Sequence, residues 1–119
     1  MSETVAVRPI ARTDHEAWLP LWEGYNRFYE RTAAPEVTAM TWSRFFDAYE
    51  PVHALVAEVD GAVVGIVHYI FHRNTSMIGP TCYLQDLFTA PAARGRGIGR
   101  ALIEAVYDAA RTAGAGRVY

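Results

Sequence analysis

Three glycines and three arginines gather in one short segment of the chain, Arg94-Gly95-Arg96-Gly97-Ile98-Gly99-Arg100-Ala101. Apolar residues typical of a strand precede this segment, and a helical apolar pattern follows it. Free N–H groups at a helix start, with the positive end of the helix dipole, form a site for anions. Arginines add charge-assisted hydrogen bonds to phosphate oxygens. The segment therefore predicts a site for a phosphate or pyrophosphate.

The glycine spacing excludes two common nucleotide loops. The dinucleotide fingerprint needs its third glycine where the chain has Arg100 or, counted from the next glycine, Leu102. The P-loop needs a lysine, and all 11 cationic residues of this chain are arginines. A plain connection between strand and helix is the alternative, but three arginines around the glycines favour the anion site.

The spacing Arg94-x-x-Gly97-x-Gly99 resembles the acetyl-CoA pyrophosphate loop of the GNAT family of N-acetyltransferases. The segment 83–89, YLQDLFT, resembles the family's fourth strand, which leads into that loop. The segment 59–65, VDGAVVG, resembles the hairpin between its second and third strands. Within the family, residues 83–89 and 105–119 look most like the diamine acetyltransferases and the histone and polyamine acetyltransferases. The resemblance covers essentially the whole chain.

This resemblance implies an enzyme that transfers the acetyl group of acetyl-CoA to a primary amine of a small molecule or a protein. Backbone groups of Leu87, Phe88 and Thr89 would bond the pantetheine arm. The loop residues that would hold the pyrophosphate are Arg94, Gly95, Arg96, Gly97, Ile98, Gly99, Arg100 and Ala101. The alternative function is a non-catalytic module that keeps the fold and binds acetyl-CoA or a partner.

Gln85 and Asp86 are the candidate catalytic residues. Diamine acetyltransferases have an acidic residue at the position of Gln85, where it receives or deprotonates the amine. Glutamine does not act as a base, which weakens the interpretation as a polyamine enzyme. Strand alternation points the neighbouring Asp86 to the opposite face unless a bulge intervenes. The structural alternative for Asp86 is a buried carboxylate bonded to the backbone or an arginine.

Trp22, Tyr25 and Tyr29 are the candidate substrate residues, because they fall on one face of a predicted helix and could contact a cationic amine. Aromatic residues at helical spacing are also typical of a core. His68 and His72 share one face of a predicted strand, but no third ligand at suitable spacing supports a metal site. Packing, hydrogen bonding and a distant proton relay are the alternatives for His68.

The predicted elements position these residues in an α/β (α+β) fold, with a mixed, mainly antiparallel sheet flanked by helices in the order β-α-α-β-β-β-α-β. A capping box from Thr13 to Glu16 should open the first helix, which Pro20 should kink or delay. A loop is expected at 32–39 and a second helix, capped by Thr41, at 42–49. The remaining elements are strands at 5–10, 53–59, 62–72 and 81–89, a hairpin turn at Asp60-Gly61, a helix at 97–112 and a strand beginning at 117.

Composition places the chain among single globular domains. It has 119 residues, of which 51% are hydrophobic and 20% charged, so one core is expected and a disordered chain is excluded. The net charge of −2 argues against nucleic-acid binding, and no apolar run is long enough to span a membrane. The single cysteine, Cys82, excludes an internal disulfide. We expect a cytoplasmic protein.

The chain stops where its fifth strand begins, although strands usually continue for about five or six residues. The family continues with the rest of that strand, a helix and two more strands, which commonly supply a tyrosine proton donor. The domain at 1–119 is therefore expected to lack these elements and the general acid. A homodimer in which a partner completes the open sheet edge is a further expectation.

Overall fold

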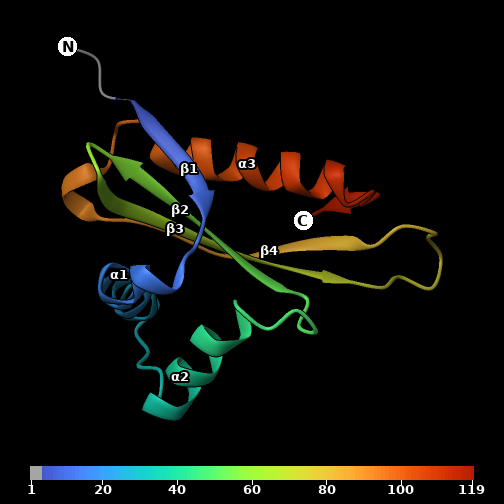
Figure 1. The fold of residues 1–119 in the computed structure, drawn as a ribbon, viewed down its shortest axis with the longest axis horizontal. Helices are drawn as coiled ribbons and strands as arrows, with labels where there is room; N and C mark the ends of the chain where they lie inside the picture. The colour runs from blue at the N-terminus through green and yellow to red at the C-terminus, as the bar shows by residue number, and fades with distance from the viewer. Residues whose placement is uncertain (1–3) are drawn as a thin grey trace.

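Residues 4–119 are described by the structure, a computed structural model, as a five-stranded sheet with helices on both faces (Figure 1). The strands are β1 (Val5–Pro9), β2 (Val52–Val59), β3 (Ala62–His72), β4 (Thr81–Thr89) and β5 (Arg117–Val118). The helices are α1 (His15–Phe28), α2 (Pro35–Arg44) and α3 (Ile98–Thr112), with 3₁₀ turns at Arg12–Asp14 and Pro91–Ala93. The expected α/β class and element order are confirmed.

The sheet follows chain order, β1-β2-β3-β4-β5. Neighbouring strands are antiparallel except for β4 and β5, which are parallel, with Cys82 opposite Val118. The β2–β3 connection is the predicted hairpin turn. Asp60 and Gly61 both have positive φ there (52° and 79°), as a type I′ turn requires.

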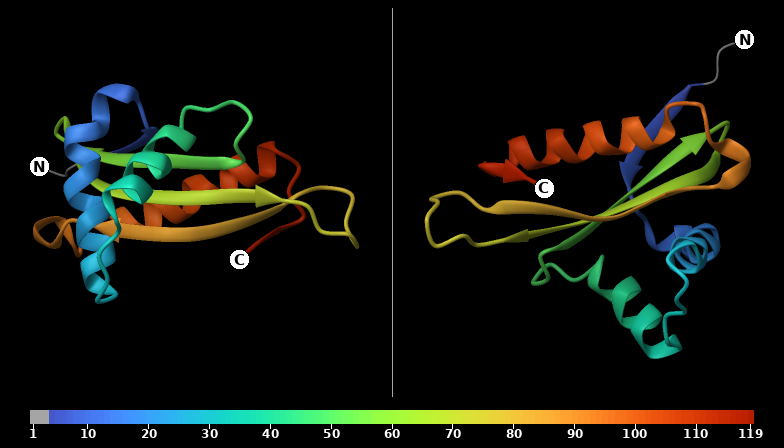
Figure 2. Two further views of the ribbon diagram at one scale, coloured as in Figure 1. Left: turned by 90° about the horizontal axis from the view of Figure 1, so that it is seen from below. Right: turned by 180° about the vertical axis from the view of Figure 1, so that it is seen from behind.

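Helix α3 covers one face of the sheet and α1 and α2 cover the other (Figure 2), and each face has its own apolar core. On the first face, the buried residues of α3 are Ile98, Leu102, Val106 and Ala110. The opposite face is covered by α1 and α2, and the buried residues there are Trp18, Leu21, Trp22, Tyr25, Val56 and Ile66. The sheet is therefore covered on both sides, and β4 lies between the two helical layers.

The start of α1 differs from the expectation. Asp14, and not Thr13, is the N-cap residue of α1, and its side chain does not cap that helix but accepts a hydrogen bond from the Ala11 N–H at 2.7 Å, at the start of the 3₁₀ turn. The helix begins at His15 and continues through Pro20. A proline inside a helix costs about 3 kcal/mol, and burial of the neighbouring apolar face offsets that cost here.

The second helix was misplaced by sequence reasoning. It spans Pro35–Arg44, and the predicted helix at 42–49 overlaps only its end. Pro35 occupies the first turn of the helix, where a missing N–H breaks no hydrogen bond. Pro35, the one proline of the expected loop 32–39, therefore marks a helix start and not a loop.

Among the helices within residues 4–119, none has the length and apolar character needed to cross a lipid bilayer. In the same range, no three histidine, cysteine or acidic side chains gather in a way that could hold a metal ion.

Candidate functional site

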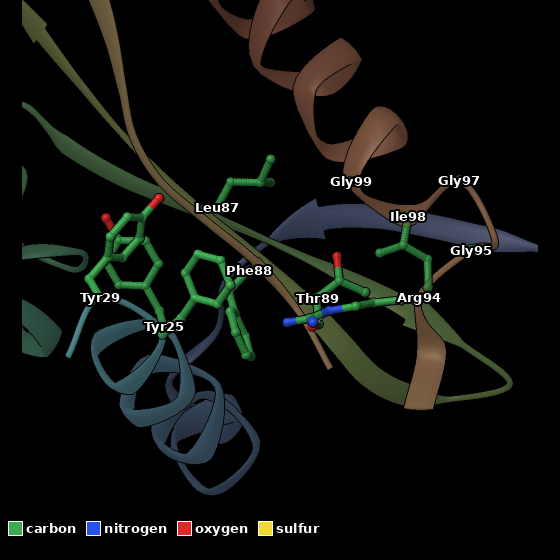
Figure 3. Close-up of a pocket in the computed structure, with 11 residues that line it drawn as sticks. Tyr25, Tyr29, Leu87, Phe88, Thr89, Arg94, Gly95, Gly97, Ile98 and Gly99 are labelled. Atoms are coloured by element: carbon green, nitrogen blue, oxygen red, sulfur yellow. The ribbon is translucent and has the colours of Figure 1, made fainter. Parts of the chain in front are cut away.

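A cavity of about 380 Å³ lies between the end of β4, the C-terminal half of α1 and the loop before α3 (Figure 3). Two tyrosines of the α1 segment stand at one end, the glycine-rich loop stands at the other, and β4 runs between them. The residues that line it are Tyr25, Phe28, Tyr29, Leu87, Phe88, Thr89, Arg94, Gly95, Gly97, Ile98 and Gly99. Segments distant in the sequence thus meet around one space.

The loop end of the cavity combines open backbone with a helix start. Gly95 and Gly97 have φ of 82° and 76°, a region that side chains with a Cβ rarely adopt. A Cβ placed on either glycine, or on Gly99, would meet no atom within 4 Å, so the backbone faces open space. The Ala101 N–H already donates to the Gly97 carbonyl at 3.0 Å. The N–H groups before it, at the first turn of α3, are the ones that can receive an anion.

The arginines and the other loop residues differ in their contacts and in whether they line the cavity. Arg94 Nε donates to the Thr89 carbonyl at 3.1 Å, and its guanidinium lies over the Phe88 ring. Arg100 pairs with Glu104 at 3.0 Å on the exposed side of α3. Arg96 is exposed and, like Arg100 and Ala101, is not among the residues that line the cavity. Ile98 lines it and also packs in the core, with 2% of its surface exposed.

The end of β4 offers backbone groups on the side away from β3. The Ala90 N–H donates to the Val64 carbonyl, and the register pairs Phe88 with Ile66. Hydrogen-bonded and non-bonded pairs alternate in an antiparallel ladder, so Phe88 bonds to β3 through its backbone. The backbone groups of Leu87 and Thr89 point away from β3. Leu87 and Thr89, two of the three strand residues predicted to hold pantetheine, therefore have backbone groups that do not bond to β3.

A β-bulge decides where Asp86 points. His68 is opposite Asp86 and Tyr69 is opposite Leu84, so Gln85 is an extra residue in β4. The bulge reverses the alternation, and Asp86 faces His68 on the α1 side of the sheet. Gln85 is exposed, whereas Asp86 retains 7% of its surface exposure. Neither side chain lines the cavity.

Asp86 is held by a buried chain of polar side chains. The Trp18 Nε1–H donates to His68 Nε2 at 3.1 Å, and His68 Nδ1 lies 2.9 Å from Asp86 Oδ2. Indole nitrogen only donates, so Nε2 is the acceptor and the proton of the neutral ring is on Nδ1. His68 therefore donates to Asp86 and holds the carboxylate oxygen as an acceptor. Trp18 and His68 are 0% and 2% exposed, so water does not compete for these bonds.

Tyr25 connects this buried chain to the cavity. Its ring lines the cavity, while its hydroxyl donates to the Gln85 carbonyl at 3.5 Å. Burial, together with the adjacent Asp86 carboxylate, raises the pKa of Tyr25 to about 12. At neutral pH the phenol is thus protonated and serves as a donor. The arrangement can pass a proton between the cavity and Asp86.

The three predicted substrate residues separate into two groups. Tyr25 and Tyr29 line the cavity, with ring centroids 5.2 Å apart. Trp22 lines a second cavity, of about 450 Å³, between α1 and α2, and its Nε1–H donates to Thr38 Oγ1 at 3.0 Å. Trp22 also packs in the core on the α1 face of the sheet. This agrees with the structural alternative, in which aromatic residues at helical spacing belong to the core.

Sequence reasoning missed two residues of this region. Trp18 is an apolar residue of α1, yet its indole N–H donates to His68, 50 positions away. Arg31 was not singled out, yet its guanidinium lies over the rings of Tyr25 and Tyr29. No local pattern marks either contact, because one crosses from α1 to β3 and the other follows from the turn after α1.

Comparison with known proteins identifies the family. The acetyltransferase (GNAT) family model matches residues 16–119. The chain belongs to the GNAT family. It is also 33% identical, over 121 aligned positions, to the D-amino-acid N-acetyltransferase HPA3 of Saccharomyces cerevisiae. That alignment covers 100% of this chain and 75% of the relative.

Solved GNAT structures share the fold. The aminoglycoside N-acetyltransferase AAC(6')-Iy in complex with CoA matches with a TM-score of 0.82 and 19% identity, over 99% of this chain and 76% of that one. The ribosomal-protein-alanine N-acetyltransferase of Brucella melitensis biovar Abortus 2308 matches with a TM-score of 0.80 and 22% identity, over 97% and 77%. Acetyl transfer to an amine, with acetyl-CoA as cosubstrate, is the activity that GNAT membership and the yeast relative support for this chain.

Proposed function

We propose that the 380 Å³ cavity is the acetyl-CoA site and that the acceptor amine enters at its tyrosine end. The observation that carries this proposal is the order of groups along the cavity. An anion-binding helix start lies at one end, backbone of β4 in the middle, and a protonated phenol at the other. A molecule with a pyrophosphate, an amide-containing arm and a reactive thioester presents its groups in the same order.

The binding residues have distinct roles in this proposal. The N–H groups at the start of α3 hold the pyrophosphate, and the exposed Arg96 and Arg100 add positive charge beside it. Arg94 shapes the cavity floor through Phe88 and Thr89. The backbone of Thr89 bonds the pantetheine arm.

Acetyl-CoA, when bound, supplies a thioester carbon that an amine can attack. An alkylammonium has no free electron pair, so it must first lose a proton. For this transfer the Tyr25 O–H turns from the Gln85 carbonyl to the adjacent Asp86 carboxylate, gives its proton to Asp86 and receives the proton of the amine, while the His68 N–H holds Asp86 as an acceptor. The Leu87 N–H, which points away from β3, polarises the thioester oxygen. The nitrogen–carbon bond forms as the carbon–sulfur bond breaks, and the thiolate takes up a proton.

The proposed acceptor is a primary amine of a small molecule. The yeast relative is named for D-amino acids, and the tyrosine end of the cavity is lined by aromatic rings, with the Tyr25 hydroxyl as the path to Asp86. The net charge of −2 offers no attraction for nucleic acid. Gln85, which is exposed and neutral, supplies no base.

Calorimetric titration with acetyl-CoA, followed by thiol release over a panel of amines, tests the function. Binding with turnover is the expected result, and binding without turnover supports the non-catalytic module instead.

The variant Gly97→Val tests whether the loop binds acetyl-CoA. The variant should lose acetyl-CoA binding, because a β-branched side chain disfavours φ of 76° and would fill the anion site. Gly61→Val is the matched control: its φ is 79°, but it lies in the β2–β3 turn. Equal affinity in all three proteins would contradict the loop assignment.

Two further proposals concern assembly and location. We propose that two copies associate along β5, because the sheet order places this short strand at an edge. Light scattering at micromolar concentration should show a dimer, and a monomer would overturn the proposal.

We also propose a cytoplasmic location, because the one cysteine, Cys82, is free and buried, as is usual in reducing compartments. Cell fractionation tests it.

A further inference from the structure

Arg31, just beyond α1, lines the second cavity and not the 380 Å³ one, but it stacks on the two tyrosines at the end of the latter. Its guanidinium carbon lies 5.4 Å from the ring centroid of Tyr25 and 5.3 Å from that of Tyr29, both of which line the cavity. Its Nε donates to Asn26 Oδ1 at 3.1 Å. That bond does not use the two Nη groups, which are the part of the fork that binds carboxylates side by side.

Asn26 makes the position of Arg31 well defined. This amide is 5% exposed, and its Nδ2 donates to the Trp22 carbonyl at 2.9 Å, which fixes Oδ1 as the acceptor for Arg31. The Arg31 backbone N–H also donates to the Asn26 carbonyl at 3.0 Å. An exposed arginine that is held at its backbone, its Nε and its flat face has lost much of its rotamer freedom before a ligand arrives.

A cation and an anion flank one hydroxyl at this end of the cavity. The Asp86 carboxylate raises the pKa of Tyr25 and the Arg31 guanidinium lowers it, so both groups lie beside the phenol. Asp86 is buried, and Arg31 is exposed. A ligand that carries an amino group and a carboxylate on the same carbon matches this pair.

A purely structural role for Arg31 is the competing explanation. A cation near a helix C-terminus interacts favourably with the helix dipole. Arg27 already lies in the last turn of α1 and meets that need. Stacking of Arg31 on two cavity-lining rings is not required for it.

We propose that Arg31 binds the carboxylate of the acceptor and that the acceptor class is the free α-amino acid. This inference rests on the proposed acetyl transfer. The amino group faces Tyr25, through which its proton reaches Asp86, while the adjacent carboxylate lies on the Nη groups of Arg31. Polyamines and peptide N-termini have no carboxylate next to the amine, so they gain nothing from Arg31.

The test compares acceptors that differ only at the carboxylate. We would measure thiol release with D- and L-alanine, with D- and L-alaninamide and with isopropylamine, at equal concentrations of free amine. At least one enantiomer of alanine should show a kcat/KM tenfold or more above that of its amide and of isopropylamine. Equal kcat/KM for the acid and the amide would overturn the proposal while leaving acetyl transfer intact.

Variants locate the selectivity at Arg31. Arg31→Gln should lower kcat/KM for the preferred alanine tenfold or more, mainly through KM, and leave isopropylamine nearly unchanged. Arg31→Lys should restore part of the loss, since it keeps the charge but not the fork. Arg27→Gln is the matched control, because Arg27 carries the same charge and also lines the second cavity, whereas Arg31 is the one of the two that stacks on Tyr25 and Tyr29. An equal loss with every amine would contradict a carboxylate-specific role.

A binding measurement separates this inference from the proposed function. With the protein saturated in CoA, calorimetry should detect binding of alanine to the unaltered protein and to Arg27→Gln, but not to Arg31→Gln. If no amine is acetylated, the proposed function fails, and this titration still decides the role of Arg31. Absence of alanine binding to the unaltered protein overturns the inference.

Discussion

Asp86 obtains its orientation and its partners from residues far away in the sequence. The bulge at Gln85 turns it toward His68, and Trp18 determines which nitrogen of His68 carries the proton. Trp18 of α1 and His68 of β3, together with the bulge in β4, thereby hold the Asp86 carboxylate oxygen as an acceptor. A lone buried carboxylate would be costly, and this chain of hydrogen bonds offsets that cost.

His68 is therefore expected to act as a positioning residue. His68→Leu removes the N–H that donates to Asp86 and leaves the Trp18 N–H without its acceptor. We expect a loss of about 1–3 kcal/mol in the free energy of unfolding and a lower kcat with little change in the KM for acetyl-CoA. His68→Gln supplies both a donor and an acceptor and should restore part of kcat. A purely structural role would lower stability and leave the kcat of the folded protein unchanged.

At the scale of elements, the distance between α3 and the sheet sets the geometry of the loop end. A Cβ on Gly65 of β3 would lie 2.9 Å from Ile98 Cγ2 and 3.1 Å from Leu102 Cδ1. Ile98 is the first residue of α3 and lines the cavity. The helix start, with its N–H groups, thus rests directly on a glycine of the sheet.

Gly65→Ala should push the start of α3 away from β3. Overpacking of this kind costs about 1–3 kcal/mol in the free energy of unfolding. We also expect weaker acetyl-CoA binding, because the anion-binding N–H groups move with Ile98. Denaturant unfolding measures the first effect and calorimetry the second. Unaltered stability would show that the core accommodates the extra methyl group without a shift of α3.

At the scale of the whole molecule, Arg8 ties the N-terminal strand to the rest of the fold. Its guanidinium donates to Asp14 at 2.7 and 2.9 Å and, through Nε, to Glu58 at 2.8 Å. These contacts join β1, the turn before α1, and β2. The hydrogen bonds from Arg8 and from the Ala11 N–H hold the pKa of Asp14 below its usual range.

This linkage predicts a loss of stability in acid. Because the pKa of Asp14 is lower in the folded than in the unfolded protein, its contribution is present above about pH 4 and is lost as the pH falls below that value. Asp14→Asn should lower the free energy of unfolding at pH 7 by about 1 kcal/mol, since the part-exposed Arg8 is screened by solvent, and should flatten the acid dependence. Thermal unfolding from pH 3 to pH 7 measures it.

Asp108→Asn provides the matched control for this prediction. Asp108 pairs with Arg111 at 2.7 Å, but both side chains are largely exposed, so the substitution should leave the acid dependence unchanged. If the two variants responded alike, the acid dependence would not come from the Arg8 and Asp14 contact.

Much of this protein follows from local sequence patterns. Alternating and periodic apolar residues predicted all five strands and the helix 98–112, and Asp60-Gly61 predicted the hairpin turn. The glycine and arginine spacing before α3 predicted a GNAT loop, and the family is confirmed. These features depend on neighbours in the chain, which is why they can be read from it. The helix Pro35–Arg44 was misplaced because a proline is compatible with both a loop and a helix start.

Only the tertiary structure decided what faces the cavity. The bulge at Gln85 has no marker in the residue types of β4, yet it reverses the direction of Asp86. The contact of Trp18 with His68 and the stacking of Arg31 on Tyr25 arise because α1 crosses the sheet beside the end of β4. Side-chain periodicity in the sequence indicates which residues are buried. Which buried groups meet depends on strand register and helix placement, and those are set by packing of the whole chain.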